Sequence, residues 1–376
     1  MADARSVLTL LAERRNVLLS GPPGTGKSRL LSAVASMFEA AGAAAPPAFA
    51  PLNGIPIPKR VGAGVGVPTS MAMLNRKVFR AVMHQSSKYR DFLTGVMPDL
   101  RPGMPPGQFR IVEGILYKAS RYAEQPGHAS LLIIDEINRG PAVQVFGGSI
   151  VAIEGEKRLA EDGTRRPETQ FFDLLDPATG ELVEHAFPSR LYILAAMNQA
   201  DVSVEPLDVA FLRRWAPVRL EPSPETLRQH FGLPAVKGLL PPEPGDAGNV
   251  YEAAVQAFEA VNGRIALGRG PEFRIGHGVL MVPSGDVPGT EEGALTHVAT
   301  AWTLVRNHVE EAFFGDVRGT AIVLNAGRGV TGHPLDLKEE TFGDAPRAVL
   351  TGPVTTGPDG IYALLKAVAA GSAEGQ

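Results

Sequence analysis

An eight-residue stretch near the start of the chain constrains its fold more than any other feature. Residues 21–28, Gly-Pro-Pro-Gly-Thr-Gly-Lys-Ser, fit the pattern G-x-x-x-x-G-K-[S/T]. They follow the apolar stretch 16–20, which is typical of a strand, and precede a helical pattern from 29 to about 40. Glycines at these spacings let successive backbone N–H groups point at one anion, and the helix N-terminus adds partial positive charge. This strand–loop–helix order predicts a phosphate-binding loop for a nucleoside triphosphate.

The residue types of the loop suit the chemistry of a nucleotide bound with Mg²⁺. We expect Lys27 to reach the β- and γ-phosphates and Ser28 to offer its hydroxyl to the metal ion. The residues expected to contact the nucleotide are Gly21, Pro22, Pro23, Gly24, Thr25, Gly26, Lys27 and Ser28. The alternative is a turn rich in glycine and proline that matches the pattern by chance, and the flanking strand and helix argue against it.

Two acidic residues follow a second apolar stretch. Residues 131–134 are Leu-Leu-Ile-Ile, which fits a strand covered on both faces, and Asp135 and Glu136 come directly after them. A phosphoryl-transfer site needs one acid for the Mg²⁺ shell and one to polarise the attacking water. We assign Asp135 to the metal and Glu136 to the water, which predicts hydrolysis. The alternative is a helix N-cap with two acids in its first turn.

A third apolar stretch, 191–195, leads to Asn198. Because neighbouring parallel strands end at one crevice, we expect Asn198 to lie close to the γ-phosphate and to act as a sensor of it. The alternative is an asparagine that opens a loop.

Arg213 and Arg214 follow a short helical pattern. A guanidinium suits the charge on a transferred phosphoryl group. The other roles in the nucleotide site are already assigned to residues of the same chain. These arginines are therefore expected to serve a neighbouring subunit, the alternative being a solvated helix end, and the sequence does not choose between them.

The same patterns predict the domain organisation. Strands alternate with helices over 1–220, which predicts an α/β core with a parallel sheet. In this core, 41–69 is rich in Ala, Gly and Pro and is interpreted as an insertion, and 158–189 carries two turn signals and is interpreted as a hairpin insertion. A mainly helical domain is expected at 221–345, and a C-terminal helix with a frayed tail at 346–376. Besides the helix that follows the phosphate-binding loop, helices are expected at 114–123, 142–153, 225–231, 250–261, 292–314 and 360–370. A further strand is expected at 80–83.

Composition narrows the remaining chemistry. The 376 residues include no cysteine, which excludes disulfides, thiolate zinc sites and Fe–S clusters. A net charge of −4 argues against nucleic-acid binding through bulk positive charge, although a local basic groove stays open. The apolar runs fall short of the roughly 18 residues that span a bilayer. We therefore expect a cytoplasmic protein without a membrane anchor.

Taken together, these motifs resemble the AAA+ ATPases, and in detail the McrB/MoxR, or dynein-related, branch. Residues 134–140, Ile-Asp-Glu-Ile-Asn-Arg-Gly, are similar to the acidic motif that MoxR and McrB proteins share. Residues 197–201, Met-Asn-Gln-Ala-Asp, resemble the Met-Asn-Thr-Ala-Asp signature of McrB-type restriction-system NTPases, with Gln199 in place of Thr. Further McrB-like stretches are 84–95, 109–116, 145–147, 153–158, 273–277 and 310–316. The resemblance covers roughly residues 5–325.

The resemblance implies a AAA+ P-loop core with a parallel sheet between helices and a smaller helical lid. It implies a hexameric ring that hydrolyses nucleotide with Mg²⁺ at subunit interfaces and drives a partner, a McrC-like nuclease in a DNA restriction or defence complex that contacts DNA. ATP is favoured over GTP because Gln199 departs from the GTP-using signature. His277 lies in the stretch that matches Ile-Gly-His, and we expect it near the nucleotide; the alternative is a histidine in a helical core. Asn138 and Arg139 are expected to act in the site or to contact a neighbouring subunit; the alternative is a capping turn.

Two other functions fit the same motifs. A MoxR-like ATP-dependent remodelling chaperone would act on protein partners, and the acidic motif that both branches share favours it equally. A nucleotide-gated scaffold would use its ring state as the output without turnover. The presence of Glu136 argues against the scaffold, because a carboxylate placed to polarise water predicts hydrolysis.

Overall fold

The chain forms two compact units in a computed structural model. The first unit comprises residues 1–20 and 27–220, and the second comprises residues 21–26 with 221–376. The structure describes residues 3–40, 50–52, 55–57, 67–72, 74–105, 107–200, 207–282, 286–327, 332–353 and 355–370. The first unit has two apolar cores and the second unit has one.

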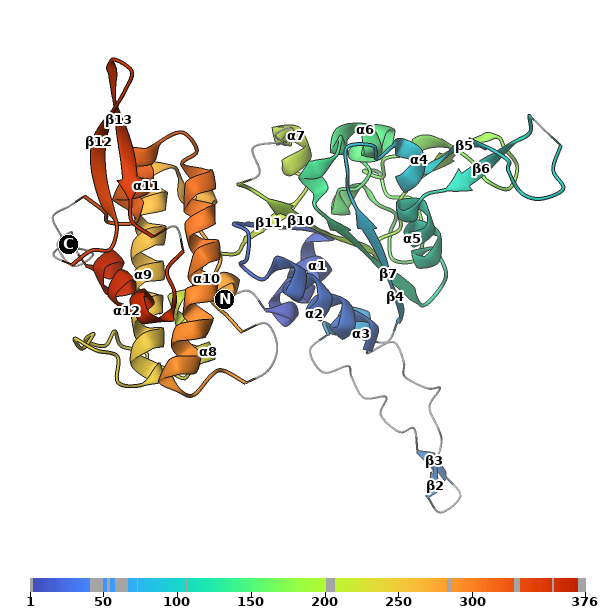
Figure 1. The fold of residues 1–376 in the computed structure, drawn as a ribbon. Coiled ribbons are helices and arrows are strands. Elements are labelled where there is room, and N and C mark those ends of the chain that lie inside the picture. Colours follow the sequence, from blue (N-terminus) through green and yellow to red (C-terminus); the bar gives the residue numbers. More distant parts are fainter. Residues whose placement is uncertain are drawn as a thin grey trace. The chain divides into compact units, whose positions relative to one another are not determined.

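A five-stranded sheet in the order β11-β1-β10-β7-β4 organises the first unit (Figure 1). β11 pairs with β1, β10 with β7, and β7 with β4, all in parallel. The strands are β1 (Asn16–Gly21), β4 (Asn75–Val82), β7 (His128–Asp135), β10 (Leu191–Asn198) and β11 (Ala216–Arg219). The α/β fold with a parallel sheet predicted from the sequence is confirmed.

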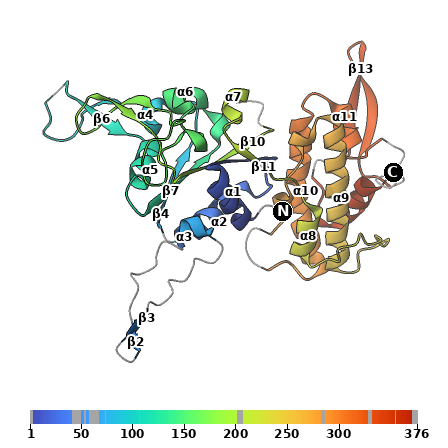
Figure 2. The ribbon, with the colours of Figure 1, turned by 180° about the vertical axis from the view of Figure 1, so that it is seen from behind.

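Helices cover both faces of this sheet, which explains why its central strands are continuously apolar (Figures 1 and 2). Alternate residues of β7 point to opposite faces, so Leu131 and Ile133 join one core while Leu132 and Ile134 join the other. The first of these cores contains α1 (Ala4–Arg14) and α2 (Lys27–Ala40), and the second contains α5 (Ile115–Ala123), α6 (Ala142–Phe146) and α7 (Val209–Leu212). The remaining short helices of this unit are α3 (Thr69–Ala72) and α4 (Tyr89–Phe92).

Three antiparallel hairpins extend from the first unit. They are β2 (Ala50–Leu52) with β3 (Ile55–Ile57), β5 (Thr94–Pro98) with β6 (Phe109–Glu113), and β8 (Phe172–Leu175) with β9 (Leu182–His185). The last hairpin lies inside the segment 158–189, where the sequence predicts one. Most of the predicted insertion 41–69 lies outside the described residues. The helix expected at 142–153 is shorter, because Gly147 has φ 48° and a 3₁₀ turn follows it.

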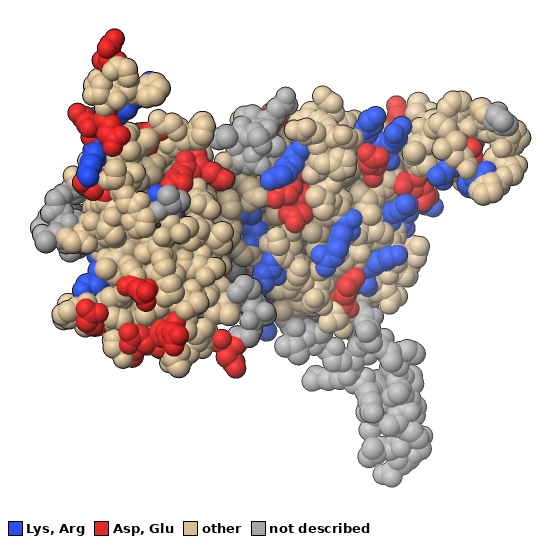
Figure 3. All heavy atoms as spheres, in the orientation of Figure 1, with Lys and Arg blue, Asp and Glu red and all other residues tan. Residues whose placement is uncertain are grey.

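The second unit is mainly helical and packs around α9 (Figure 1). Its helices are α8 (Pro224–Phe231), α9 (Ala247–Gly268), α10 (Glu291–Ala312), α11 (Val317–Val323) and α12 (Pro358–Ala369). One hairpin interrupts the helices, β12 (Asp336–Phe342) with β13 (Ala345–Thr351), and it was not expected from the sequence. Its strands are largely exposed and carry no alternating apolar face, and acidic side chains lie at its tip and nearer its base (Figure 3). Among the described helices, none is both long and apolar enough to cross a bilayer.

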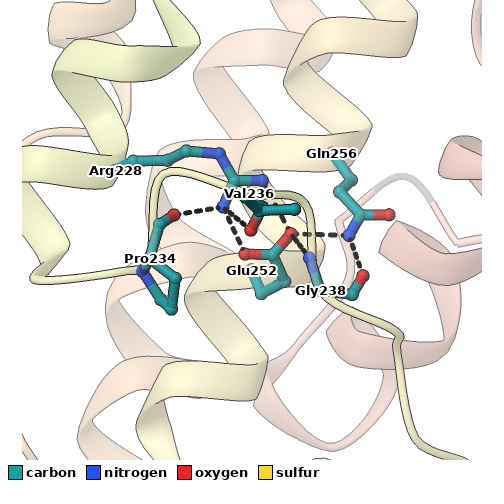
Figure 4. Close-up of polar contacts among 6 residues, drawn as sticks. All are labelled: Arg228, Pro234, Val236, Gly238, Glu252 and Gln256. Atoms are coloured by element: carbon teal, nitrogen blue, oxygen red, sulfur yellow. Dashed lines mark hydrogen bonds and ion pairs between the residues drawn. The ribbon is translucent and has the colours of Figure 1, made fainter.

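A buried ion pair joins α8 to α9 (Figure 4). Arg228 donates from Nη1 to Glu252 Oε2 and from Nη2 to Oε1, both at 2.7 Å, and Gln256 Nε2 donates to Oε1 at 2.6 Å. Burial alone would raise the pKa of Glu252, but the hydrogen bonds from Arg228 and Gln256 outweigh it and lower that pKa. Each charge is thus compensated by a bidentate partner, which is the arrangement that makes burial of an ion pair tolerable.

Candidate functional site

The loop between β1 and α2 has the backbone that a phosphate cradle requires. Gly24 and Gly26 have φ of 77° and 88°, values at which any side chain would be strained. A Cβ added at Gly26 would meet no described atom within 4 Å, so the loop faces open space there. Thr25 Oγ1 donates to the Pro22 carbonyl at 2.8 Å, which closes the turn, and α2 begins at Lys27. The local geometry therefore fits the phosphate-binding loop that the sequence predicts.

Lys27 is a buried cation beside two carboxylates. Only 8% of the residue is exposed. Burial lowers the pKa of Lys27 to about 8, although the charges of Glu136 and Asp135 act in the opposite direction. A buried cation is stabilised when an anion binds next to it. The environment of Lys27 thus favours a phosphate ligand.

Glu136 and Asn198 meet at the carboxyl ends of β7 and β10. The two strands are paired in parallel, with Ile134 opposite Ala195, so their ends share one edge of the sheet. Asn198 Nδ2 donates to Glu136 Oε1 at 2.6 Å. Asn138 Nδ2 in turn donates to the Asn198 carbonyl at 2.9 Å, which ties the turn after β7 to β10. The structure therefore brings together the acidic pair and the amide that the sequence placed near one another.

The conformation of Glu136 is unusual. It has φ 54° and ψ 45°, a left-handed conformation that is rare for a residue other than glycine. Its Oε2 atom is inaccessible to solvent and accepts no hydrogen bond, although Arg139 Nε lies 3.3 Å away in an ion pair. A buried carboxylate oxygen with unused acceptor capacity is suited to take a hydrogen bond from water. The carboxylate of Glu136 thus has one oxygen held by Asn198 and one in an ion pair with Arg139 that keeps unused hydrogen-bond acceptor capacity.

Asp135 and Ser28 fit Mg²⁺ as partial ligands. Asp135 is half-buried at the end of β7, and its Oδ1 accepts only the backbone N–H of Glu136, at 3.1 Å, among the described contacts. Ser28 is exposed at the second residue of α2. No group of three or more His, Cys, Asp or Glu in the described part of the chain forms a metal cage. One carboxylate and one hydroxyl suit Mg²⁺, because this ion takes most of its ligands from water and phosphate.

His277 lies in the second unit, where the phosphate-loop residues 21–26 also belong. The N–H groups of Gly276 and Gly278 donate to the carbonyls of Pro23 and Gly24, each at 2.9 Å. His277 Nδ1 accepts the Ser223 N–H at 3.3 Å, and burial lowers the pKa of the imidazole. The ring is therefore a buried, hydrogen-bonded group in a segment whose backbone holds the phosphate loop.

Arg213 and Arg214 lie on a separate cleft of the first unit. The cleft has a volume of about 1090 Å³, and five arginines line it: Arg14, Arg15, Arg166, Arg213 and Arg214. Its described lining contains neither Lys27 nor the residues at the ends of β7 and β10. The cleft was missed by the sequence reasoning, because its walls come from α1, the 154–166 segment and the α7–β11 turn, which no local pattern connects.

The two neighbouring arginines differ in their surroundings. Arg214 is half-buried, with Nε 2.9 Å from Glu154 Oε1, and its Nη1 donates to the Ala210 carbonyl. Arg213 is exposed; its backbone N–H donates to the Val209 carbonyl at 3.1 Å, but its guanidinium makes no hydrogen bond or ion pair with the described residues. The guanidinium of Arg213 is therefore the one that can reach out of the cleft.

Comparison with known proteins agrees with the fold and the motifs. Residues 69–215 match the family model of the AAA domain, dynein-related subfamily. Of curated proteins, the "Type IV methyl-directed restriction enzyme EcoKMcrB subunit" of Escherichia coli (strain K12) is 29% identical over 328 residues, which are 83% of this chain and 56% of that protein.

A second curated relative is also a restriction-system component. The "Type II restriction enzyme BsuMI component YdiS" of Bacillus subtilis (strain 168) is 31% identical over 210 residues, which are 54% of this chain and 56% of that protein. The chain thus spans about half the length of the curated relatives it matches. A solved structure described as a putative ATPase from Cytophaga hutchinsonii ATCC 33406 aligns with 82% of this chain and 79% of its own, at 13% identity and a TM-score of 0.31.

These matches confirm the resemblance to McrB-type AAA+ ATPases that the motifs predict. Residues 69–215 are similar to the AAA domains of the dynein-related subfamily, and the chain is similar over 83% of its length to an McrB restriction subunit. The family match begins at residue 69 and so excludes the phosphate loop, for which the evidence is the motif itself together with its strand, turn and helix.

Proposed function

We propose that this protein is a Mg²⁺-dependent nucleoside triphosphatase that works as a ring and drives a McrC-like nuclease partner in a DNA restriction complex. The observation that carries the enzymatic part is the contact of 2.6 Å between Asn198 Nδ2 and Glu136 Oε1, beside the buried cation of Lys27. A cation for phosphate, a carboxylate for water and an amide for both are the groups that phosphoryl transfer requires.

Each residue then has a role in hydrolysis. Backbone N–H groups of the loop and Lys27 hold the β- and γ-phosphates, and Ser28 with Asp135 holds Mg²⁺, which neutralises charge on the phosphate oxygens. Glu136 accepts a proton from the attacking water while Asn198 orients it. Arg213 of a neighbouring copy stabilises the charge on the transferred phosphoryl group. Residues 1–220 form the nucleotide-binding core and 221–345 the lid, with His277 near the nucleotide.

The curated relatives support the proposed role in DNA restriction. Both are components of restriction enzymes by name, so a nuclease subunit is the partner that we propose for this chain, and DNA is reached through that complex. We propose ATP as the preferred nucleotide, with GTP as the alternative. Titration of the purified protein with each nucleotide measures the preference directly, and a clearly lower Kd for GTP would overturn it.

The partner is tested by coexpression with candidate nuclease subunits. We expect a complex that forms with ATP and Mg²⁺, is lost in Lys27→Ala and persists in Glu136→Gln, because the first variant removes the phosphate contact and the second retains it. Recovery of remodelled protein clients with no nuclease would contradict the restriction role and leave the hydrolytic role intact.

A further inference from the structure

A fully buried arginine, Arg158, lies next to the arginine cleft and has no carboxylate partner among the described residues. It has 0% exposure, and the described groups to which it donates are all neutral oxygens. Nε and Nη2 donate to the Ile153 carbonyl at 2.9 and 2.7 Å, Nη2 donates to Asn16 Oδ1 at 2.6 Å, and Nη1 donates to the Leu191 carbonyl. Burial, and then the charge of Arg15, lower the pKa of Arg158 to about 9. Holding a cation there is costly, so these four bonds indicate a specific task.

Asn16 connects Arg158 to the cleft through hydrogen bonds to both Arg158 and Arg214. It is fully buried at the start of β1, and its Nδ2 donates both to the Ile153 carbonyl at 2.8 Å and to the Arg214 carbonyl at 3.1 Å. Arg214 is thus held by its backbone through Asn16 and by its side chain through Glu154. The residue before it, Arg213, is an exposed arginine of the cleft.

We infer that Arg158 and Asn16 are positioning residues that fix the Arg214–Trp215 peptide, and with it the backbone that carries Arg213, so that Arg213 projects toward the nucleotide of a second copy. This inference rests on the proposed function, in which Arg213 acts on a neighbouring site. Arg158 orients the amide of Asn16, Asn16 holds the Arg214 carbonyl, and Glu154 keeps the Arg214 side chain inside the cleft wall. The two arginines therefore have different tasks, one structural and one in contact with the neighbour's phosphates.

An isosteric substitution separates positioning from stability. In Asn16→Asp the carboxylate still accepts from Arg158, now as a buried ion pair, but it can no longer donate to the Ile153 and Arg214 carbonyls. We expect the melting temperature to stay the same or rise, and nucleotide Kd to stay unchanged. Hydrolysis by the associated protein should fall about ten- to a hundredfold, because a displaced catalytic group costs that much.

Mixing variants shows where the defect acts. Subunits with Glu136→Gln cannot hydrolyse but keep an intact Arg213. When they are added to Asn16→Asp subunits, whose own acidic pair is intact, hydrolysis should return. A merely structural defect in Asn16→Asp would impair its own site and would not be rescued. The matched control is Asn325→Asp in the other unit, where a buried Asn also donates to two carbonyls, Ala367 and Ala370, at 2.8 and 2.9 Å. This control should lose stability and keep its hydrolysis rate per folded subunit.

The mixture also distinguishes this inference from the proposed function. Arg213→Ala mixed with Glu136→Gln must recover hydrolysis if Arg213 acts in a neighbouring site, and failure there overturns the proposed trans role. Suppose instead that the Arg213→Ala mixture recovers hydrolysis. The positioning role alone is then overturned if Asn16→Asp hydrolyses nucleotide as fast as wild type, or if its slower hydrolysis is not restored by Glu136→Gln subunits. If Asn16→Asp does not fold, Arg158→Lys is used, since a lysine keeps the charge but loses the planar fork of donors, and the same rescue is expected.

Discussion

Nucleotide affinity is predicted to fall above pH 8 because of Lys27. Burial lowers the pKa of this residue to about 8 in the free protein. If only the charged form binds phosphate, the apparent Kd is the intrinsic Kd divided by the charged fraction. At pH 9 about one Lys27 in ten is charged, so the affinity should be about tenfold weaker than at pH 7. Ionisation of the nucleotide does not add to this pH dependence of the affinity, because the terminal phosphate ionises near pH 6.

The sign of the effect follows from the direction of the pKa shift. The bound phosphates favour the charged form of Lys27 and raise its pKa, so binding takes up a proton between pH 8 and the higher pKa of the complex. Calorimetry with a non-hydrolysable triphosphate at pH 7, 8 and 9, in buffers of different ionisation enthalpy, measures both the Kd and the proton uptake.

Two results would refute this reasoning. The first is a Kd that is constant from pH 7 to pH 9 while thermal unfolding shows that the protein stays folded. The second is a weaker affinity at high pH without proton uptake, which would assign the pH dependence to another group. Lys27→Arg serves as the control, since a guanidinium stays charged throughout and its Kd should not depend on pH in this range.

Three further predictions concern single side chains. Glu136→Gln should bind nucleotide as wild type does but lose about 10²–10⁴ in phosphate release, the usual contribution of a general base, and an undiminished rate would remove Glu136 from the mechanism. Glu252→Ala should cost about 3–5 kcal/mol in urea unfolding by leaving its arginine partner buried and unpaired, against about 0.5 kcal/mol or less for the exposed Glu340→Ala. Because the pKa of Glu252 is lowered, its stabilising contribution is present above its unfolded pKa and is lost as the pH falls through the lowered value, and equal acid sensitivity in Glu252→Ala would contradict this. Gly24→Ala, at φ 77°, should destabilise the fold by about 1–2 kcal/mol and weaken nucleotide binding, whereas Gly263→Ala inside α9 should stabilise it by up to about 1 kcal/mol, and equal effects would contradict the strain argument.

The sequence was sufficient wherever the relevant residues are neighbours in the chain or lie at the ends of adjacent parallel strands. The phosphate loop combines a short motif with the strand and helix beside it. Glu136 and Asn198 are 62 residues apart, but each follows an apolar strand, and parallel strands bring such ends together. This logic predicted the parallel α/β fold and the proximity of Glu136 to Asn198, while the roles of these two residues stay predictions.

The remainder of the site depends on contacts for which the chain carries no local signal. Asn16 and Arg214 are 198 residues apart, and Arg158 is 142 residues from Asn16, so their network appears only after the sheet order is known. A polar residue at the start of a strand and an arginine in a Gly-Glu-Lys-Arg stretch look like surface positions, and their burial could not be read from periodicity. The same holds for β12 and β13, whose mostly exposed residues show no alternation.

The central claim is that nucleotide is hydrolysed through Glu136 between associated copies of this chain. Its most direct test is phosphate release per subunit, measured with ATP and with GTP across protein concentrations that span self-association, for wild type and Glu136→Gln. We predict a wild-type rate that rises with association and a Glu136→Gln rate that stays near background at every concentration. A rate that is independent of association, or one that is equal in the two proteins, would contradict the claim.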